Sequence, residues 1–393
     1  AVGVGLRDAY LNRLRDRVGE RDGDRHGGAL AVAVAHEHLD GLGAAVEQDR
    51  HNVLERAAAA FANNEEGYPE TPTESGRDEL FVLILEDVAT GEVRGTCQIF
   101  TRVGQTWPFY SYRHATLTQH SKELGRTFRA EKLNLVTDLE GSSEVGGLFL
   151  HPGERAGGLG MLLARSRYLF IAMHRKRFAD RILAELRGVI DERGGSPFWD
   201  GVAGRFFGMN FQDADYFNAI NGNQFIADLM PKHPVYIAML PETARSAIGL
   251  PHPSGRAAMR MLETEGFAAE GYIDIFDGGP TMTARTDRVR SIADAKMVPV
   301  TEVRAADDTA TRALAASGRL ADFRCTFAQI VPAGEGIALA VTQRGHVPLC
   351  LLCVQHPDHQ FLAKQRGQRA HPQVQLASAG QLQLHAPVLR DAL

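Results

Sequence analysis

The chain has 393 residues, of which 44% are hydrophobic and 23% charged, and its formal net charge at pH 7 is −5. This length allows two or three domains, and the acidic balance argues against nucleic acid as a partner because no basic excess is present to neutralise phosphates. No apolar run reaches the roughly 18 residues that suggest a membrane span, and the first 30 residues lack the pattern of a signal peptide. Four cysteines do not make a disulfide framework in such a chain. We therefore expect a cytoplasmic protein that binds neither nucleic acid nor membrane.

Strand patterns become clear from residue 80 onward. The apolar run 80–87 (LFVLILED) predicts a buried strand, and 94–100 returns after a glycine-containing turn, which predicts a hairpin. Apolar content also predicts strands at 133–139, 144–150, 180–189 and 271–280. Helical spacing and capping residues predict helices at 158–175, 196–207, 212–229, 241–248 and 254–267.

The segment between the strand at 144–150 and the helix at 158–175 has the composition of a phosphate-binding loop. Arg155 precedes three glycines, at 157, 158 and 160. The first turn of a helix carries unpaired N–H groups and a partial positive charge, and Gly157, Gly158 and Gly160 let a pyrophosphate approach without meeting a Cβ. Arg155 can add a charge-assisted hydrogen bond. The order of the glycines fits neither a P-loop nor the dinucleotide fingerprint, and a turn that only packs a helix on a sheet remains an alternative.

Long segments in the middle of the chain carry a resemblance to a known family. They include GSSEVGGLFLHP (141–152), GLGMLLARSRYLFIA (158–172), AELRGVIDERGGSPFWD (184–200), HPSGRAAMRMLETEGF (252–267) and YIDIFDGGPT (272–281). In order and spacing these segments resemble the arginine N-succinyltransferase family, within the GNAT N-acyltransferase superfamily. The resemblance implies an α+β or α/β fold of GNAT type, with a mixed, mainly antiparallel twisted sheet flanked by helices and an additional C-terminal β-containing region.

The extent of this resemblance divides the chain into four parts. Residues 1–74 form a divergent N-terminal segment, and 75–300 form the GNAT-like acyltransferase core. Residues 301–344 form a C-terminal region of the family, and 345–393 form a divergent tail.

The resemblance also implies an activity. A succinyl group would pass from succinyl-CoA to the α-amine of L-arginine, giving N2-succinyl-L-arginine and CoA in arginine catabolism. Succinyl-CoA would be a co-substrate, no permanently bound cofactor is expected, and the protein is expected to be an oligomer. Two alternatives stay open, namely ornithine or another amine as acceptor, and a non-catalytic acyl-CoA-binding or sensor protein.

Individual positions take roles by the same resemblance. The backbone N–H of Leu148 would bind the thioester carbonyl, where an oxyanion develops, although a core leucine would look the same in the sequence. The proton donor of the family corresponds to His252, and an imidazole suits proton transfer because it ionises near neutral pH. A surface-loop histidine is the alternative for His252, and His233, which also precedes a proline, is a rival candidate.

An arginine substrate needs carboxylates for its guanidinium and a cation for its own carboxylate. Glu144 begins the strand before the loop, and Asp191 and Glu192 follow the strand at 180–189. These three are candidates for the guanidinium, and Arg187 is a candidate for a carboxylate. Each carboxylate could equally be a solvated or capping group.

The C-terminal part contains the one cysteine pair with metal-ligand spacing. Cys350 and Cys353 are followed by His356 and His359. Zinc sites usually place the second ligand pair about 12 or more residues away, so we expect no metal site.

Overall fold

The computed structural model describes residues 79–87, 93–105, 107–155, 157–221, 224–305, 307–318, 320, 323–334, 336–341, 349–353 and 361–363. The expected divergent segment 1–74 and most of the expected tail 345–393 lie outside these residues. Among the helices within them, none is long and apolar enough to cross a membrane.

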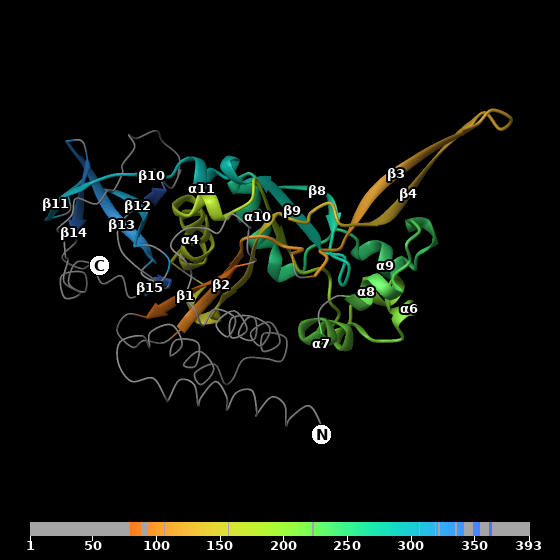
Figure 1. The fold of residues 1–393 in the computed structure, drawn as a ribbon. Helices are drawn as coiled ribbons and strands as arrows, with labels where there is room; N and C mark the ends of the chain where they lie inside the picture. Colours follow the sequence, from red (N-terminus) through yellow and green to blue (C-terminus); the bar gives the residue numbers. More distant parts are fainter. Residues whose placement is uncertain are drawn as a thin grey trace, which may run out of the picture.

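The described strands form one 16-stranded sheet (Figure 1). Its central part contains, in spatial order, β1 (Leu80–Asp87), β2 (Val93–Phe100), β5 (Ser143–Leu150), β6 (Arg181–Glu185), β9 (Pro280–Arg285), β8 (Ala268–Ile273), β3 (Ser111–Ser121), β4 (Arg126–Val136) and β7 (Val235–Tyr236). Neighbours in this part are antiparallel except β5 and β6, which are parallel. Because β3 and β4 are long and pair along their whole length, they form a hairpin that projects from the body of the molecule (Figure 1).

The C-terminal strands extend the same sheet at its other end. They are β10 (Lys296–Met297), β11 (Val300–Ala305), β12 (Thr311–Ser317), β13 (Phe323–Ala333), β14 (Gly336–Val341), β15 (Leu349–Cys353) and β16 (Phe361–Ala363). They join the central part through antiparallel pairing of β15 with β1. Strand β1 therefore lies between β2 and β15, which explains why its sequence is an almost continuous apolar run.

Helix α4 (Leu159–Met173) lies against this sheet, and nine of its 15 residues are buried. It contacts β2 and β5 on the central side and β12 and β13 on the C-terminal side, so apolar side chains cover most of its surface. The other helices are α5 (Pro197–Gly201), α6 (Gly204–Phe207), α7 (Phe211–Asn221), α8 (Gln224–Leu229), α9 (Glu242–Ala247), α10 (Arg256–Glu265) and α11 (Arg290–Ala293). Side chains of α5, α7 and α8 belong to a second core, which includes Trp199.

Several predicted elements are confirmed and others need correction. The hairpin of β1 and β2 and the strand–loop–helix order at β5 and α4 agree with the prediction. The predicted strand at 271–280 is wrong, because that stretch contains the end of β8, a turn and the start of β9. Strand β6 ends at Glu185, four residues before the predicted end, and β3 was missed.

Strands β5 and β6 run together for only two residues. Ser143 pairs with Ile182 and Glu144 pairs with Leu183, and the pairing stops there. On the other side of β5, Gly146 faces Gln98 and Phe149 faces Thr96, which leaves two β5 residues opposite one β2 residue. This is a β-bulge, and it bends β5 away from β6 just beyond the paired residues.

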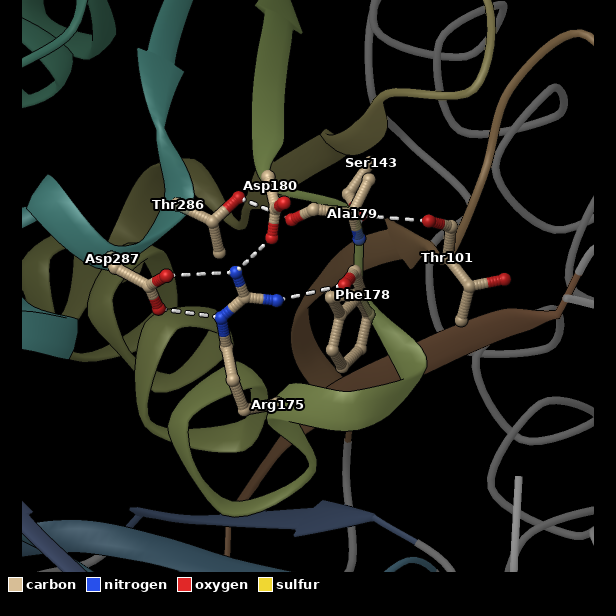
Figure 2. A network of polar contacts seen from close by, with 8 residues as sticks. All are labelled: Thr101, Ser143, Arg175, Phe178, Ala179, Asp180, Thr286 and Asp287. Atoms are coloured by element: carbon tan, nitrogen blue, oxygen red, sulfur yellow. Dashed lines mark hydrogen bonds and ion pairs between the residues drawn. The ribbon is translucent and has the colours of Figure 1, made fainter. Parts of the chain in front are cut away.

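Ser143 is one of the two β5 residues that pair with β6, and it joins three segments of backbone. Its hydroxyl donates to the carbonyl of Thr101 at 2.7 Å and accepts from the amide of Ala179 at 2.8 Å. Thr286, at the end of β9, donates to the carbonyl of Ala179 at 2.6 Å. Figure 2 shows these bonds linking β5, the segment before β6 and the end of β9.

Arg175 extends the network toward the surface (Figure 2). Its Nε and Nη2 donate to the two carboxylate oxygens of Asp287 at 2.6 and 2.9 Å. Nη2 also reaches Asp180 at 2.7 Å, and Nη1 donates to the carbonyl of Phe178 at 2.8 Å. These bonds fix the chain between α4 and β6, and hence the point where β6 enters the sheet.

The turn between β8 and β9 is built on two buried carboxyl groups. Asp277 accepts from the backbone amides of Gly188 at 2.7 Å and Gly279 at 2.8 Å. Asp274 accepts from the amides of Phe276 at 2.7 Å and Asp277 at 2.8 Å. Burial raises the pKa of Asp274 well above its usual range, and the neighbouring charge of Asp277 adds to the rise. The turn thereby holds the segment that leaves β6.

Replacing Ser143 with alanine should destabilise the protein. The side chain is fully buried, so Ser143→Ala leaves a buried carbonyl and a buried amide without their partner, at a cost of about 1–3 kcal/mol. Urea unfolding followed by circular dichroism would measure the change. Ser246→Ala is the matched control, because that exposed hydroxyl bonds only within its own helix. Equal stability of the two variants would contradict the role given to Ser143.

Replacing Asp274 with asparagine should change how stability depends on pH. A carboxyl group whose pKa is raised by folding stabilises the protein below its ordinary pKa of 3.8, and this contribution is lost as pH rises through the folded value. Asparagine keeps the accepting oxygen without the charge. The free energy of unfolding of Asp274→Asn, relative to the parent, should therefore increase from pH 4 toward neutrality in urea titrations.

Asp307→Asn is the control for this pH series. Hydrogen bonds from Thr309 lower the pKa of Asp307, so that variant should lose stability relative to the parent as pH rises from acid. A difference between Asp274→Asn and the parent that stays constant with pH would show that Asp274 does not titrate as described.

Candidate functional site

A cavity of about 380 Å³ opens where β5 and β6 part. Its walls come from β5 (Val145 to Leu148), from the end of β6 and the segment after it (Ala184 to Arg187), from α4 and from the start and inner face of α10. A cavity of this size is in the usual range for a small-molecule site. The backbone of β5 between Val145 and Leu148 lines it directly, because β6 has already turned away.

The charged side chains that line the cavity are mostly cationic. Four are arginines and two are glutamates, namely Arg165, Arg167, Arg187, Arg260, Glu185 and Glu265. Arg165 and Glu265 pair with each other, with 2.7 Å between Nε and Oε1. The excess of positive charge favours an anionic ligand in the cavity.

The predicted phosphate loop lies at the N-terminus of α4. Gly157 and Gly158 adopt left-handed conformations, with φ of +68° and +86°, and Gly158 is the N-cap of α4. No side chain caps this end of the helix, so its first-turn N–H groups remain directed outward. A Cβ on Gly157 would meet nothing within 4 Å, and one on Gly160 would make only an ordinary contact with Leu150.

Arg155 lies beside this helix end, exposed, and within the described part of the chain no side-chain bond or ion pair engages it. The left-handed backbone at 157 and 158 favours glycine at both positions. Gly160 has no such conformation, and the space around it would admit a side chain. The uncapped helix end and the free guanidinium together can hold a phosphate group.

Leu148 lies in the β5 bulge and lines the cavity. Gly147, directly before it, has φ of +55°, and a side chain there would collide with the buried side chain of Gln98, at 2.8 Å. The bulge therefore depends on glycine at 147. It brings Leu148 to the wall of the cavity.

His252 lies at the N-cap of the short 3-10 helix η4 (Pro253–Gly255), and its backbone amide donates to the carbonyl of Arg187 at 2.7 Å. Its Nδ1 lies 2.7 Å from the Ser254 hydroxyl and accepts from the Ser254 amide at 3.3 Å. Because Nδ1 makes both of these contacts, Nε2 is the ring nitrogen left for other contacts. Ser254 and Gly255, next along the chain, line the cavity, so His252 is at its rim.

A second histidine, His151, has the same local geometry as His252 but is not closely followed in the chain by residues that line the cavity. His151 caps η1 (Pro152–Glu154), and its Nδ1 accepts from the amide of Gly153 at 3.1 Å. The backbone angles of the two histidines agree closely, with φ and ψ of −51° and 133° at His151 and −50° and 144° at His252. The His-Pro sequence alone therefore explains the cap, and only the location of His252 points to function. His233 is exposed and is not among the residues that line the cavity.

The candidate substrate-binding residues do not all line the cavity. Arg187 lines the cavity, whereas Glu144, Asp191 and Glu192 are absent from its walls. Asp191 accepts from the amides of Arg193 and Gly195, at 2.8 and 2.9 Å, within its own turn. Its hydrogen bonds are those of a carboxylate that shapes a loop.

Sequence reasoning missed five of the six charged residues that line the cavity, among them Arg165, Arg167 and Glu185. The two arginines interrupt an otherwise apolar helix, and the glutamate ends a buried strand. A charge within a buried element was the signal that could have identified them.

Cysteine and metal chemistry find no support in the described part of the chain. Burial raises the pKa of the Cys97 thiol to about 11, although the charge of nearby Arg167 opposes the rise. Among the described residues, no group of three or more His, Cys, Asp or Glu side chains could hold a metal ion. His356 and His359 lie outside those residues.

Comparisons with known proteins agree with this arrangement. A family model described as the arginine N-succinyltransferase beta subunit matches residues 33–291. Arginine N-succinyltransferases of Escherichia coli O139:H28 (strain E24377A / ETEC) and Shigella flexneri are each 44% identical over 266 residues, which cover 68% of this chain and 77% of theirs.

A solved structure, that of arginine/ornithine succinyltransferase subunit AI from Pseudomonas aeruginosa, shares the fold. It matches with a TM-score of 0.68 and 29% identity, over 88% of this chain and 97% of that one. The likeness confirms the expected GNAT-type mixed sheet flanked by helices. On the family match and the 44% identity together, the chain belongs to the arginine N-succinyltransferase family.

Proposed function

We propose that this chain transfers a succinyl group from succinyl-CoA to the α-amine of L-arginine, giving N2-succinyl-L-arginine and CoA. The observation that carries the proposal is the cavity between β5 and β6, which is lined by α4 just beyond its uncapped first turn and by Ser254 and Gly255, close to His252 in the chain. Family membership supplies the nature of the acyl donor and the acceptor.

The residues of the site suggest how CoA would bind. Its pyrophosphate would lie against the first turn of α4, with Arg155 adding a charge-assisted hydrogen bond. The pantetheine arm would then follow the edge of β5 that β6 leaves uncovered, and the thioester carbonyl would reach the main chain of Leu148. No metal ion and no permanently bound cofactor take part in this scheme.

The chemistry would be direct transfer. The α-amine attacks the thioester carbon, and the negative oxygen of the tetrahedral species receives a hydrogen bond from the Leu148 amide. The C–S bond then breaks, the amide forms, and the proton lost by the nitrogen passes to the CoA thiolate. His252, whose Nδ1 is engaged by Ser254, would carry this proton on Nε2.

A thiol-release assay tests the proposal directly. With succinyl-CoA and L-arginine the parent should release free CoA at a rate well above that with succinyl-CoA alone. L-Ornithine and L-lysine should be compared in the same assay, because the solved relative is named for both arginine and ornithine. Tight binding of succinyl-CoA without thiol release for any amine would instead favour a non-catalytic acyl-CoA-binding protein.

Placing a negative charge at the start of α4 should weaken acyl-CoA binding without unfolding the protein. An aspartate in the first turn stabilises a helix, and Gly160 has ordinary space for a side chain. Gly160→Asp should therefore keep or raise the melting temperature. Repulsion of the phosphates should raise the KM for succinyl-CoA by about 10-fold or more at low salt.

Gly160→Ala serves as the uncharged control, and its KM for succinyl-CoA should stay within a few-fold of the parent. Gly158 is a poorer position for this test, because its φ of +86° would strain any side chain. An unchanged KM in a folded Gly160→Asp variant would show that phosphates do not bind at this helix end.

Removing the imidazole at 252 should affect turnover much more than acyl-CoA binding. General acid–base help contributes about 10²–10⁴-fold to a rate, so His252→Ala should lower kcat by that factor. The affinity for succinyl-CoA, measured by calorimetry, should change little, because the interaction is made mainly in the transition state.

His151→Ala is the matched control, since it removes the same kind of cap at a position to which no proton transfer is assigned. It should match His252→Ala in thermal stability while keeping turnover within a few-fold of the parent. Full activity of His252→Ala with loss of activity in His233→Ala would transfer the role to His233.

A further inference from the structure

We propose that Arg167 binds the free carboxylate at the end of the acyl group and thereby makes the site selective for acyl-CoAs with a charged end. The inference rests on the proposed acyl-CoA site and adds the residue that distinguishes a dicarboxylic acyl group from a neutral one.

Arg167 is a buried cation at the wall of the cavity. It lies on the third turn of α4, is only 4% exposed, and lines the opening between β5 and β6. Its Nε donates to the carbonyl of Ala164 at 3.1 Å, and its Nη1 donates to the carbonyl of Gly146 at 3.4 Å. Both acceptors are neutral, and in the described part of the chain no carboxylate forms an ion pair with it.

The other arginines at the cavity differ from Arg167. Arg165 is paired with Glu265, whose second oxygen accepts from the amide of Ser291 at 2.8 Å. Arg260 is exposed on α10, and Arg187 follows the end of β6. Of the four arginines that line the cavity, only Arg167 is deeply buried and, in the described part of the chain, hydrogen-bonded to neutral groups. Its charge is therefore the one that the protein compensates least.

The direction of the bound acyl-CoA leads to this guanidinium. In the proposed site the phosphates lie beyond the C-terminal end of β5 and the thioester lies at Leu148. The acyl chain must therefore continue the other way along β5, toward Gly146. Two residues of a regular strand span about 6–7 Å, and the bulge shortens this distance; a succinyl group together with one hydrogen bond to its far carboxylate can cover it. The Gly146 carbonyl is where Arg167 makes its Nη1 bond.

The energetics favour an anion at this point. A buried ion without a counter-charge is costly, and neutral hydrogen bonds offset only part of the cost. A carboxylate placed against the guanidinium would supply the missing charge in a water-poor site, where charge-assisted bonds are strong. A neutral acyl chain of the same length would leave Arg167 uncompensated.

A purely structural role predicts a different outcome. If Arg167 only held the Gly146 carbonyl and thus the bulge in β5, its loss would slow transfer from every acyl-CoA alike. Selectivity between charged and neutral acyl groups is therefore the deciding measurement. Butyryl-CoA is the matched neutral probe, because it has the same chain length as succinyl-CoA and lacks the carboxylate.

The experiment compares kcat/KM for succinyl-CoA and butyryl-CoA, with L-arginine as acceptor, in the parent and in Arg167→Met. The parent should prefer succinyl-CoA, and Arg167→Met should lower that ratio by roughly 10–10²-fold, as expected for loss of a hydrogen bond to a charged group. Arg167→Lys should retain part of the preference. Arg260→Met, at the same cavity, should change both substrates alike and leave the ratio unaltered.

Binding of the two acyl-CoAs without acceptor, measured by calorimetry, separates this inference from the proposed activity. If the parent transfers succinyl groups to arginine but Arg167→Met keeps the parental ratio, the inference is wrong and the activity stands. If arginine is not an acceptor, loss of the succinyl-CoA binding preference in Arg167→Met still supports the inference. Should the variant fail to fold, equal affinity of the parent for succinyl-CoA and butyryl-CoA would by itself refute it.

Discussion

The short parallel pairing of β5 with β6 is the constraint on which the site depends. Because the two strands pair only at Ser143 and Glu144, main chain that would normally lie inside a sheet becomes the wall of a cavity. Near these paired residues, the hydrogen bonds of Ser143 and Arg175 hold the backbone of the neighbouring segments in place (Figure 2). The bulge at Gly147 then sets the direction in which β5 departs.

Positive groups lie both at the start of α4 and in the wall of the cavity. The first turn of α4 is uncapped and is preceded by exposed Arg155, and the buried guanidinium of Arg167 lines the cavity. Positive charge at these two places suits a ligand with phosphates at one end and a carboxylate at the other, and less so a ligand with one charge. In the proposed site, α4 would bind the acyl-CoA at two places, its first turn and its third turn.

The sequence predicted well those features that depend on neighbouring residues. The glycines at 157 and 158 occupy left-handed backbone conformations, and the proposed phosphate loop was predicted from them. Long-range contacts set the features that were missed. Helix α4 is buried on two sides because β12 and β13 cover it, so helical spacing alone gave no sign that Arg167 would face a cavity. The apolar residues around Asp274 suggested a strand, although its carboxyl group forms a turn with the amides that follow.

The bulge in β5 has a consequence for how the site can change over time. The group assigned to the oxyanion is the amide of Leu148, which every residue except proline possesses. Every substitution of Leu148 other than proline therefore leaves this donor in place, and alanine scanning would not remove it. Gly147 is different, because a side chain there meets Gln98. On the proposed role of its amide, Leu148 should tolerate substitution better than Gly147, which has no assigned role in the reaction.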